Sequence, residues 1–165
     1  MKLKWALAMG THILAAVVEL FMITVLFGTY DEVKNDPYAW VLIAMIVALS
    51  LASINNVFTT YCIVRYNNAE QTFSKSINYV YTGFIIFSIL FLIALSYAIF
   101  SAWSTGFGTY RELSSQDRLG LSVIIFFSLL CLWNLIAQIQ FRRYLKNKQM
   151  ATLNELIHNI GQTLP

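Results

Sequence analysis

Charged and chemically reactive residues are scarce in this sequence. Only 12% of its 165 residues are charged, whereas about a quarter of the residues in an ordinary soluble domain carry a charge. The chain has two cysteines and two histidines, and it contains no CxxC or HExxH motif, no Gly-rich phosphate loop and no nucleophile elbow. These absences give metal, cofactor and covalent chemistry little support. We therefore predict no metal site, no cofactor and no enzymatic activity.

Apolar residues are abundant instead. Hydrophobic residues make up 58% of the chain, and the mean hydropathy is +0.64. A soluble chain this short could not bury so much apolar surface. Four stretches approach or exceed the roughly 20 apolar residues that a helix needs to cross a bilayer. They are Trp5–Phe27, Trp40–Val64, Tyr79–Trp103 and Leu121–Phe141. We therefore predict an all-α membrane protein with four transmembrane helices.

Lys and Arg are unevenly divided between the two sides of this predicted bundle. One side carries Lys2, Lys4, Arg65, Lys75, Arg142, Arg143, Lys146 and Lys148, and the other carries Lys34, Arg111 and Arg118. Since positively charged loops stay in the cytoplasm, we predict that both termini are cytoplasmic, in a multi-pass protein of the bacterial inner membrane. The net charge of +3 favours an anionic lipid surface as a partner, and we predict no binding to nucleic acid.

The predicted outer loop between the first two helices is acidic. Asp31, Glu32 and Asp36 lie close together there. A solvated acidic surface is the simpler interpretation of such a cluster, and capture of a cation is the functional alternative. We keep these three residues as outer-face candidates.

Two parts of the sequence resemble each other. The letters FGTY end the first apolar stretch at 27–30, and the same letters end the third at 107–110. Residues 50–66 align without gaps on residues 128–144 at nearly the same separation, with matching Ser-Leu, Asn and Arg-Tyr letters. A second match at a similar offset indicates an internal duplication.

The duplicated unit is a two-helix hairpin. We predict one copy at 1–70 and a second at 71–145, and the alignment pairs Asn56 with Asn134. Because each copy enters from the same side of the membrane, the axis that relates the copies should lie along the membrane normal. Both asparagines should then face the interior of the bundle at the same depth.

Particular residues predict the helix ends. Gly28 and Gly108 suit a helix-terminating position with positive φ. Trp5 and Tyr66 suit the inner membrane interface, where amphipathic rings lie at the level of the headgroups.

Small residues recur every four positions on two predicted helices and predict faces that pack closely against a neighbour. They are Ala44, Ala48 and Ala52 on the second helix, and Ala94, Ala98 and Ala102 on the third.

His12 and Glu19 are the two ionisable residues within the apolar stretches. Placing an ionisable group inside a bilayer costs free energy, so such a residue is treated as a functional candidate and is expected to have a bonding partner. They lie on one face of one helix but about 10 Å apart along its axis, so they cannot bond to each other directly. Their partners must come from other helices.

Counting from the helix centres predicts two polar layers. His12 is level with Asn55, Asn56 and Asn134, and Glu19 is near the level of three serines. The serines are Ser50, Ser96 and Ser128. Gln138 completes the set of interior polar candidates.

Three roles are open for these interior groups. The first is mutual bonding that fixes the helix register, the second is an ion or proton path, and the third is the lining of a ligand or cofactor pocket. The Asn56 and Asn134 pair has two possible roles, and amide bonds between helices are favoured over the lining of a small pore.

The segment 146–165 is a separate feature. Its apolar residues recur at helical spacing, and Lys146 and Lys148 precede them. They are Met150, Leu153, Leu156, Ile157, Ile160 and Leu164. We predict a C-terminal cytoplasmic amphipathic helix that lies on the inner membrane surface or against a protein partner.

Three classes of function fit these features. We favour a small non-enzymatic membrane protein that acts by helix–helix and protein–protein contacts, as an integral subunit or a binding or immunity protein of a membrane complex. The alternative is a homo-oligomeric ion channel or small transporter that uses Glu19 and His12. A membrane enzyme is the least favoured class, because such enzymes usually cluster His, Asp or Cys near one interface.

Overall fold

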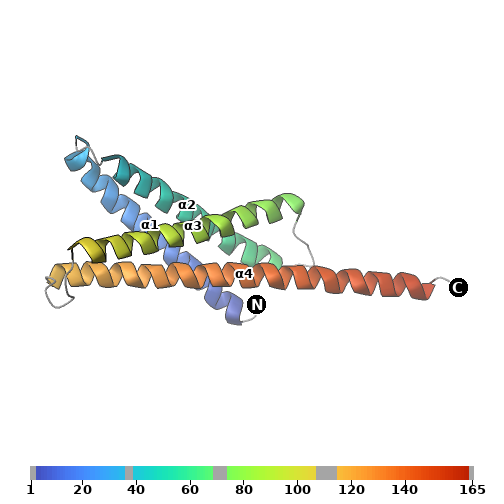
Figure 1. Ribbon diagram of the computed structural model, residues 1–165. Coiled ribbons are helices and arrows are strands. Elements are labelled where there is room, and N and C mark those ends of the chain that lie inside the picture. The colour runs from blue at the N-terminus through green and yellow to red at the C-terminus, as the bar shows by residue number, and fades with distance from the viewer. Residues whose placement is uncertain (1–2, 36–38, 69–73, 107–114, 164–165) are drawn as a thin grey trace.

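The structure, a computed structural model, consists of helices and the turns that flank them. It describes residues 3–35, 39–68, 74–106 and 115–163. Within these ranges only the backbone is described at 31–33, 68, 98, 101–106, 115–121, 156 and 158–163. The helices are α1 (Leu3–Val33), α2 (Ala39–Asn68), α3 (Lys75–Gly106) and α4 (Ser115–Thr163), and the described residues contain no strand (Figure 1). All four are long and apolar enough to cross a membrane, which confirms the predicted all-helical membrane architecture.

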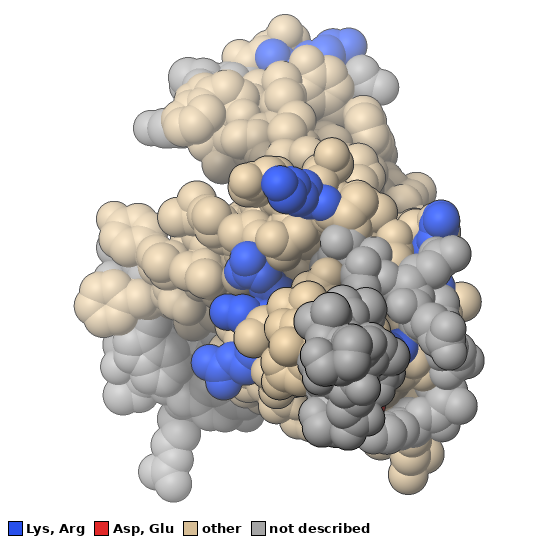
Figure 2. Space-filling view, turned by 90° about the vertical axis from the view of Figure 1, so that its right-hand side faces the viewer, with Lys and Arg blue, Asp and Glu red and all other residues tan. Residues whose placement is uncertain are grey.

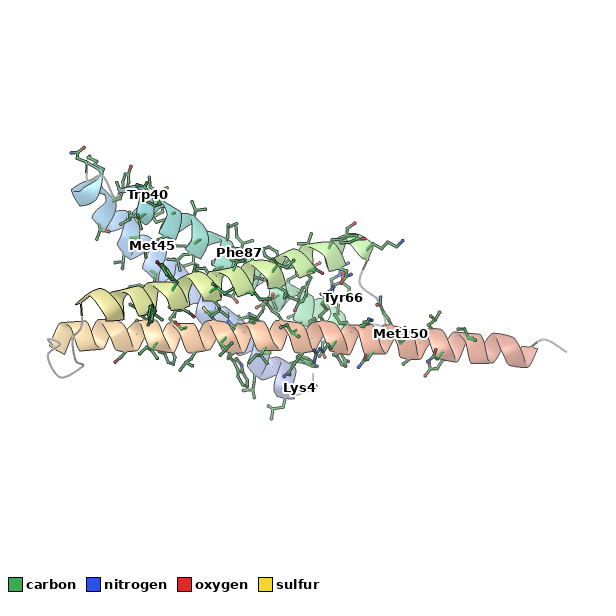
Figure 3. The ribbon with its side chains drawn as sticks, viewed as in Figure 1. Lys4, Trp40, Met45, Tyr66, Phe87 and Met150 are labelled. Atoms are coloured by element: carbon green, nitrogen blue, oxygen red, sulfur yellow. The ribbon has the colours of Figure 1, made fainter. Side chains whose placement is uncertain are left out.

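The helices form two crossing pairs. α1 and α2 lie side by side, α3 and α4 lie side by side, and the two pairs cross each other (Figure 1). We call the end at which α1 begins, α2 ends and α3 begins the basic end, because Lys4, Arg65 and Lys75 lie there. In Figure 3, Lys4 and Tyr66 lie toward this end, and Trp40 lies at the opposite end of α2.

α4 is the longest helix, with 49 residues, and it projects past the others at the basic end (Figure 1). The sequence predicts a separate amphipathic helix at 146–165, but α4 continues without a break to Thr163. The physical reason is that no Gly or Pro occurs between Gly120 and Gly161, so nothing in that stretch interrupts the helical hydrogen bonds.

The prediction that Gly28 ends the first helix is wrong. α1 runs past Gly28 to Val33, and no described residue has a positive φ. The Thr29 hydroxyl donates to the Leu26 carbonyl at 3.0 Å, so the side chain after the glycine bonds back to the same helix. Gly108 lies outside the described residues.

α2 is the central helix of the fold. Its buried residues fall on two adjacent stripes whose members are three, four or seven residues apart. The first stripe contains Ile46, Leu49, Ser53, Asn56, Ile63 and Asn67, and the second contains Ala52, Asn55, Thr59, Cys62 and Tyr66. Asn56 bonds to His12 and Glu19 of α1 and accepts one bond from α4, whereas Asn55 bonds only to α3 and α4 among the neighbouring helices described. The first stripe therefore faces α1, and the second faces α3 and α4.

Small residues are buried mainly on α1. Ala8, Ala15 and Ala16 are buried there, and α2 is the helix with which α1 makes its most extensive contact. On α2 the predicted stripe is buried at Ala52 and exposed at Ala44. On α3, Ala94 is exposed, and the side chains of Ala98 and Ala102 lie outside the described residues. The alanines of α1 let its backbone approach α2 closely.

Aromatic rings fill the core near the basic end. Trp5 packs edge-on against Phe141, with ring centroids 5.0 Å apart, and tilts against Tyr144 at 5.4 Å. Tyr66 and Tyr81 belong to the same buried cluster. The rings of Trp5 and Tyr66, predicted to lie at the headgroup level, are buried between helices rather than exposed at the surface.

Candidate functional site

Hydrogen bonds centred on Asn56 join three helices inside the bundle. His12 Nδ1 of α1 lies 2.6 Å from Asn56 Oδ1, and Asn56 Nδ2 donates to both carboxyl oxygens of Glu19 at 2.9 and 3.0 Å. Asn134 of α4 donates through Nδ2 to Asn56 Oδ1 at 3.2 Å and to the Thr11 carbonyl at 3.4 Å. Both asparagines are buried between the helices and bond to each other. We call this set the Asn56 network.

Chemistry fixes the donor and acceptor roles in the Asn56 network. Carboxyl oxygens accept, so Asn56 turns its NH₂ group toward Glu19 and its carbonyl oxygen toward His12. Because an amide oxygen only accepts, the imidazole proton is assigned to Nδ1 of His12. Two atoms are left over: His12 Nε2 and Asn134 Oδ1 are buried and have no partner among the described residues.

The prediction that Glu19 belongs to a separate layer with three serines is wrong. Ser50 and Ser128 donate to carbonyl oxygens one turn back in their own helices, and Ser96 is exposed. Helical side chains point toward the start of their own helix, so the long Glu19 side chain reaches back toward the level of His12. This reach brings its carboxyl group to Asn56 and merges the two predicted layers.

A second network, centred on Gln138, joins α2, α3 and α4. Gln138 Nε2 donates to Asn55 Oδ1 at 3.1 Å and to the Thr59 hydroxyl at 3.2 Å. Asn55 Nδ2 donates to the Ser88 hydroxyl at 2.8 Å, and Ser88 donates to the backbone of its own helix. The Tyr81 hydroxyl donates to the Gln138 carbonyl at 3.3 Å. We call this set the Gln138 network.

The two networks lie on different sides of α2 and form one polar belt. Successive residues of an α-helix are rotated by about 100°, so Asn55 and Asn56 point toward different neighbours. Asn134 and Gln138 are one turn apart on α4, so a single face of α4 serves both networks. The belt contains all six interior candidates: His12, Glu19, Asn55, Asn56, Asn134 and Gln138.

Sequence reasoning missed three members of the belt. Thr59, Ser88 and Tyr81 complete the Gln138 network, although none was singled out as an interior polar candidate. Two of them carried a usable signal. Thr59 lies one helical turn after Asn55, and Ser88 is an isolated hydroxyl within a long apolar run.

A small cavity of about 20 Å³ lies between the two networks. Glu19, Asn134 and Gln138 line it together with the thiol residue Cys131 and the ring of Phe87. Phe87 lies on α3 near its crossing with α2 (Figure 3). The volume suits about one water molecule, which needs about 10–15 Å³ on this scale. The cavity therefore has room for a single small polar occupant.

The structure describes less of the residues on which the outer-face and metal predictions depend. The side chains of Asp31, Glu32 and Asp36 lie outside the described residues. Among the side chains that are described, no group of three or more His, Cys, Asp or Glu residues is placed to hold a metal ion.

Comparison with known protein families, curated proteins and solved structures finds no match to this chain. The arrangement of the polar belt must therefore be interpreted from its own chemistry.

The chemistry of the belt suits connection between helices. An amide group stands between the imidazole of His12 and the carboxyl group of Glu19. A proton passes through an amide only by way of an unstable imidic acid form, so this bridge is a poor proton relay. Polar side chains that bond across membrane helices instead contribute to association, by about 0.6 kcal/mol each on average.

Proposed function

We propose that this chain is a non-enzymatic membrane protein that acts through helix–helix and protein–protein contacts. It would serve as an integral subunit of a membrane complex, or as a binding or immunity protein for one. The polar belt supports this proposal because its ionisable groups are engaged in bonds between helices. Groups used in this way fix helix register rather than react with a substrate.

The observation that carries the proposal is an apolar stripe on the projecting part of α4. Met150, Leu153 and Ile157 lie on one face of the helix at spacings of three and four residues. Their side chains are 52%, 52% and 60% exposed, within a segment otherwise rich in polar residues. Met150 is on the part of α4 that leaves the bundle (Figure 3). Such a stripe suits the groove of a partner protein.

Purification from native membranes tests this proposal. We expect a foreign protein to co-migrate in stoichiometric amount, identified by mass measurement of the intact complex. Changing Leu153 and Ile157 to Asn should remove the partner. The matched control changes Thr152 and Glu155 to Asn, which are exposed on the other side of the helix, and should keep it. Recovery of a pure homo-oligomer from the wild-type chain would contradict the proposal.

The proposal includes an orientation in which the basic end faces the cytoplasm of a bacterial cell. The excess of Lys and Arg at that end supports it. In intact cells, a membrane-impermeant thiol reagent should label a cysteine placed at Asn35 and miss one placed at Asn68. The reverse pattern would invert the orientation.

A second candidate function is a homo-oligomeric channel or small transporter. The observation in its favour is the cavity beside Glu19, together with the unpaired Nε2 of His12 and Oδ1 of Asn134. Proton and cation flux into liposomes that contain the purified chain distinguishes the two candidates. Our first proposal expects no flux above that of empty liposomes.

A further inference from the structure

A second, much larger cavity lies between α3 and α4 near the basic end. Its volume is about 610 Å³, within the range of about 300–1,000 Å³ that is usual for small-molecule sites. Lys75 lines it from α3, and Arg142, Arg143 and Lys146 line it from α4. Its described lining contains no Asp or Glu. Figure 2 views the molecule from the basic end and shows Lys and Arg side chains gathered on this face.

Four like charges around one cavity call for a compensating anion. Their mutual repulsion is weakened by water and salt, but it is not removed where they share a recess. The positive end of the α3 dipole adds to this field, because α3 begins at Lys75 and its first turn is capped by Ser74 through a bond of 3.3 Å from the Ile77 N–H group. An anionic occupant would lower the electrostatic energy of the site.

The cavity also has apolar lining residues on both helices. Ile85 of α3 and Ile139 and Leu145 of α4 line it, and Ile85 and Leu145 are otherwise buried in the bundle. The apolar span of α3 starts at Lys75, and the apolar span of α4 passes through this level. The basic rim therefore lies at the end of the apolar span of α3, and Ile85 and Ile139 lie further inside the two spans. A bound molecule needs an anionic head and a hydrocarbon body to match both parts.

We propose that this cavity binds the phosphate headgroup of an anionic phospholipid. The guanidinium groups of Arg142 and Arg143 present fork-shaped donors suited to phosphate oxygens, and Lys75 and Lys146 add point charges from opposite walls. The acyl chains run along Ile85 and Ile139. Basic pockets between membrane helices are the usual form of such sites. Inorganic phosphate shares the headgroup chemistry but lacks the hydrocarbon body.

The test uses the full chain in phosphatidylcholine nanodiscs doped with increasing phosphatidylglycerol. Thermal unfolding gives the Tm, and native mass measurement gives the number of retained lipids. We expect a saturable rise in Tm and one tightly retained phosphatidylglycerol. The rise should shrink as salt increases, because exposed charges are screened. Inorganic phosphate added to pure phosphatidylcholine nanodiscs should not reproduce the rise.

Two matched variants separate a defined site from general attraction to a basic surface. Changing Lys75 and Lys146 to Gln removes two charges from the cavity, and changing Lys4 and Arg65 to Gln removes two charges from the same end outside it. All four side chains are exposed, so both variants should fold. Each basic residue near an anionic headgroup strengthens binding by about fivefold, so the cavity variant should bind phosphatidylglycerol roughly 30-fold more weakly. The control should lose less than about threefold.

Three outcomes would overturn the proposal. Equal losses in the two variants would show only a general attraction between a basic surface and anionic lipid. A Tm that rises without saturation in the wild type would show the same. An equal rise with inorganic phosphate would assign the cavity to a soluble anion instead.

Discussion

The two hydrogen-bond networks on either side of α2 differ in composition. The Gln138 network contains only neutral amides and hydroxyls, and none of its buried side-chain atoms lacks a partner. The Asn56 network contains a carboxyl group and an imidazole, and it leaves His12 Nε2 and Asn134 Oδ1 without a partner among the side chains that are described. Amides and hydroxyls both donate and accept, so a small set of them can close on itself. The Glu19 carboxyl group accepts from Asn56 and therefore provides no donor for the two acceptors that remain, His12 Nε2 and Asn134 Oδ1.

This contrast makes Asn56 the most sensitive residue of the belt. It is the shared partner of His12, Glu19 and Asn134, so its loss disturbs three buried groups at once. Gln138 is replaceable by comparison, since Asn55 and Thr59 also bond to each other at 3.4 Å. The networks should therefore respond differently to equivalent substitutions.

The largest expected effect comes from Asn56→Leu. It is nearly isosteric, and it leaves the Glu19 carboxyl without its donor and His12 Nδ1–H without its acceptor. At about 1–3 kcal/mol for each unsatisfied buried group, we expect a loss of about 3 kcal/mol or more in the free energy of unfolding. Gln138→Met should cost about 1 kcal/mol. Reversible unfolding in mixed micelles measures both, and equal losses would remove the distinction between the networks.

An intermediate test is Glu19→Gln. The introduced amide keeps an oxygen for Asn56 Nδ2, and its NH₂ group can turn into the cavity that Asn134 also lines. We expect the free energy of unfolding to fall by less than about 1 kcal/mol. Yield of the intact complex and ion flux in liposomes should be measured on the same variant. Flux in the wild type that vanishes in this folded variant would favour the channel over the subunit.

The smallest expected effect is that of Tyr81→Phe. It removes one long bond, from the hydroxyl to the Gln138 carbonyl at 3.3 Å, and keeps the ring in its cluster. A loss of about 0.6 kcal/mol is expected, the average for such bonds between membrane helices. Tyr97→Phe, at a ring that is 72% exposed, is the control and should change nothing. A loss above about 2 kcal/mol would show that the Gln138 network is as critical as its neighbour.

The sequence predicted the helices and the membrane character with little ambiguity. Length and apolarity alone determine that a stretch such as Trp40–Val64 is able to span a bilayer as a helix, because every backbone polar group must be bonded within the helix there. The same reasoning predicted buried positions for His12 and Glu19, since exposing such groups to lipid is costly. The duplication at 1–70 and 71–145 stays a prediction; the two asparagines that it pairs, Asn56 and Asn134, bond to each other.

The partners of the polar residues were decided only by the tertiary structure. Periodicity shows that His12 and Glu19 share a face of α1. It does not show how far α2 is shifted along its axis relative to α1, and this shift places Asn56 within reach of both side chains. Likewise, Gly28 permits a helix end without requiring one, and α1 continues through it. Residues within one helix are related by a fixed rise and rotation, whereas the offset and angle between helices depend on packing along their whole length.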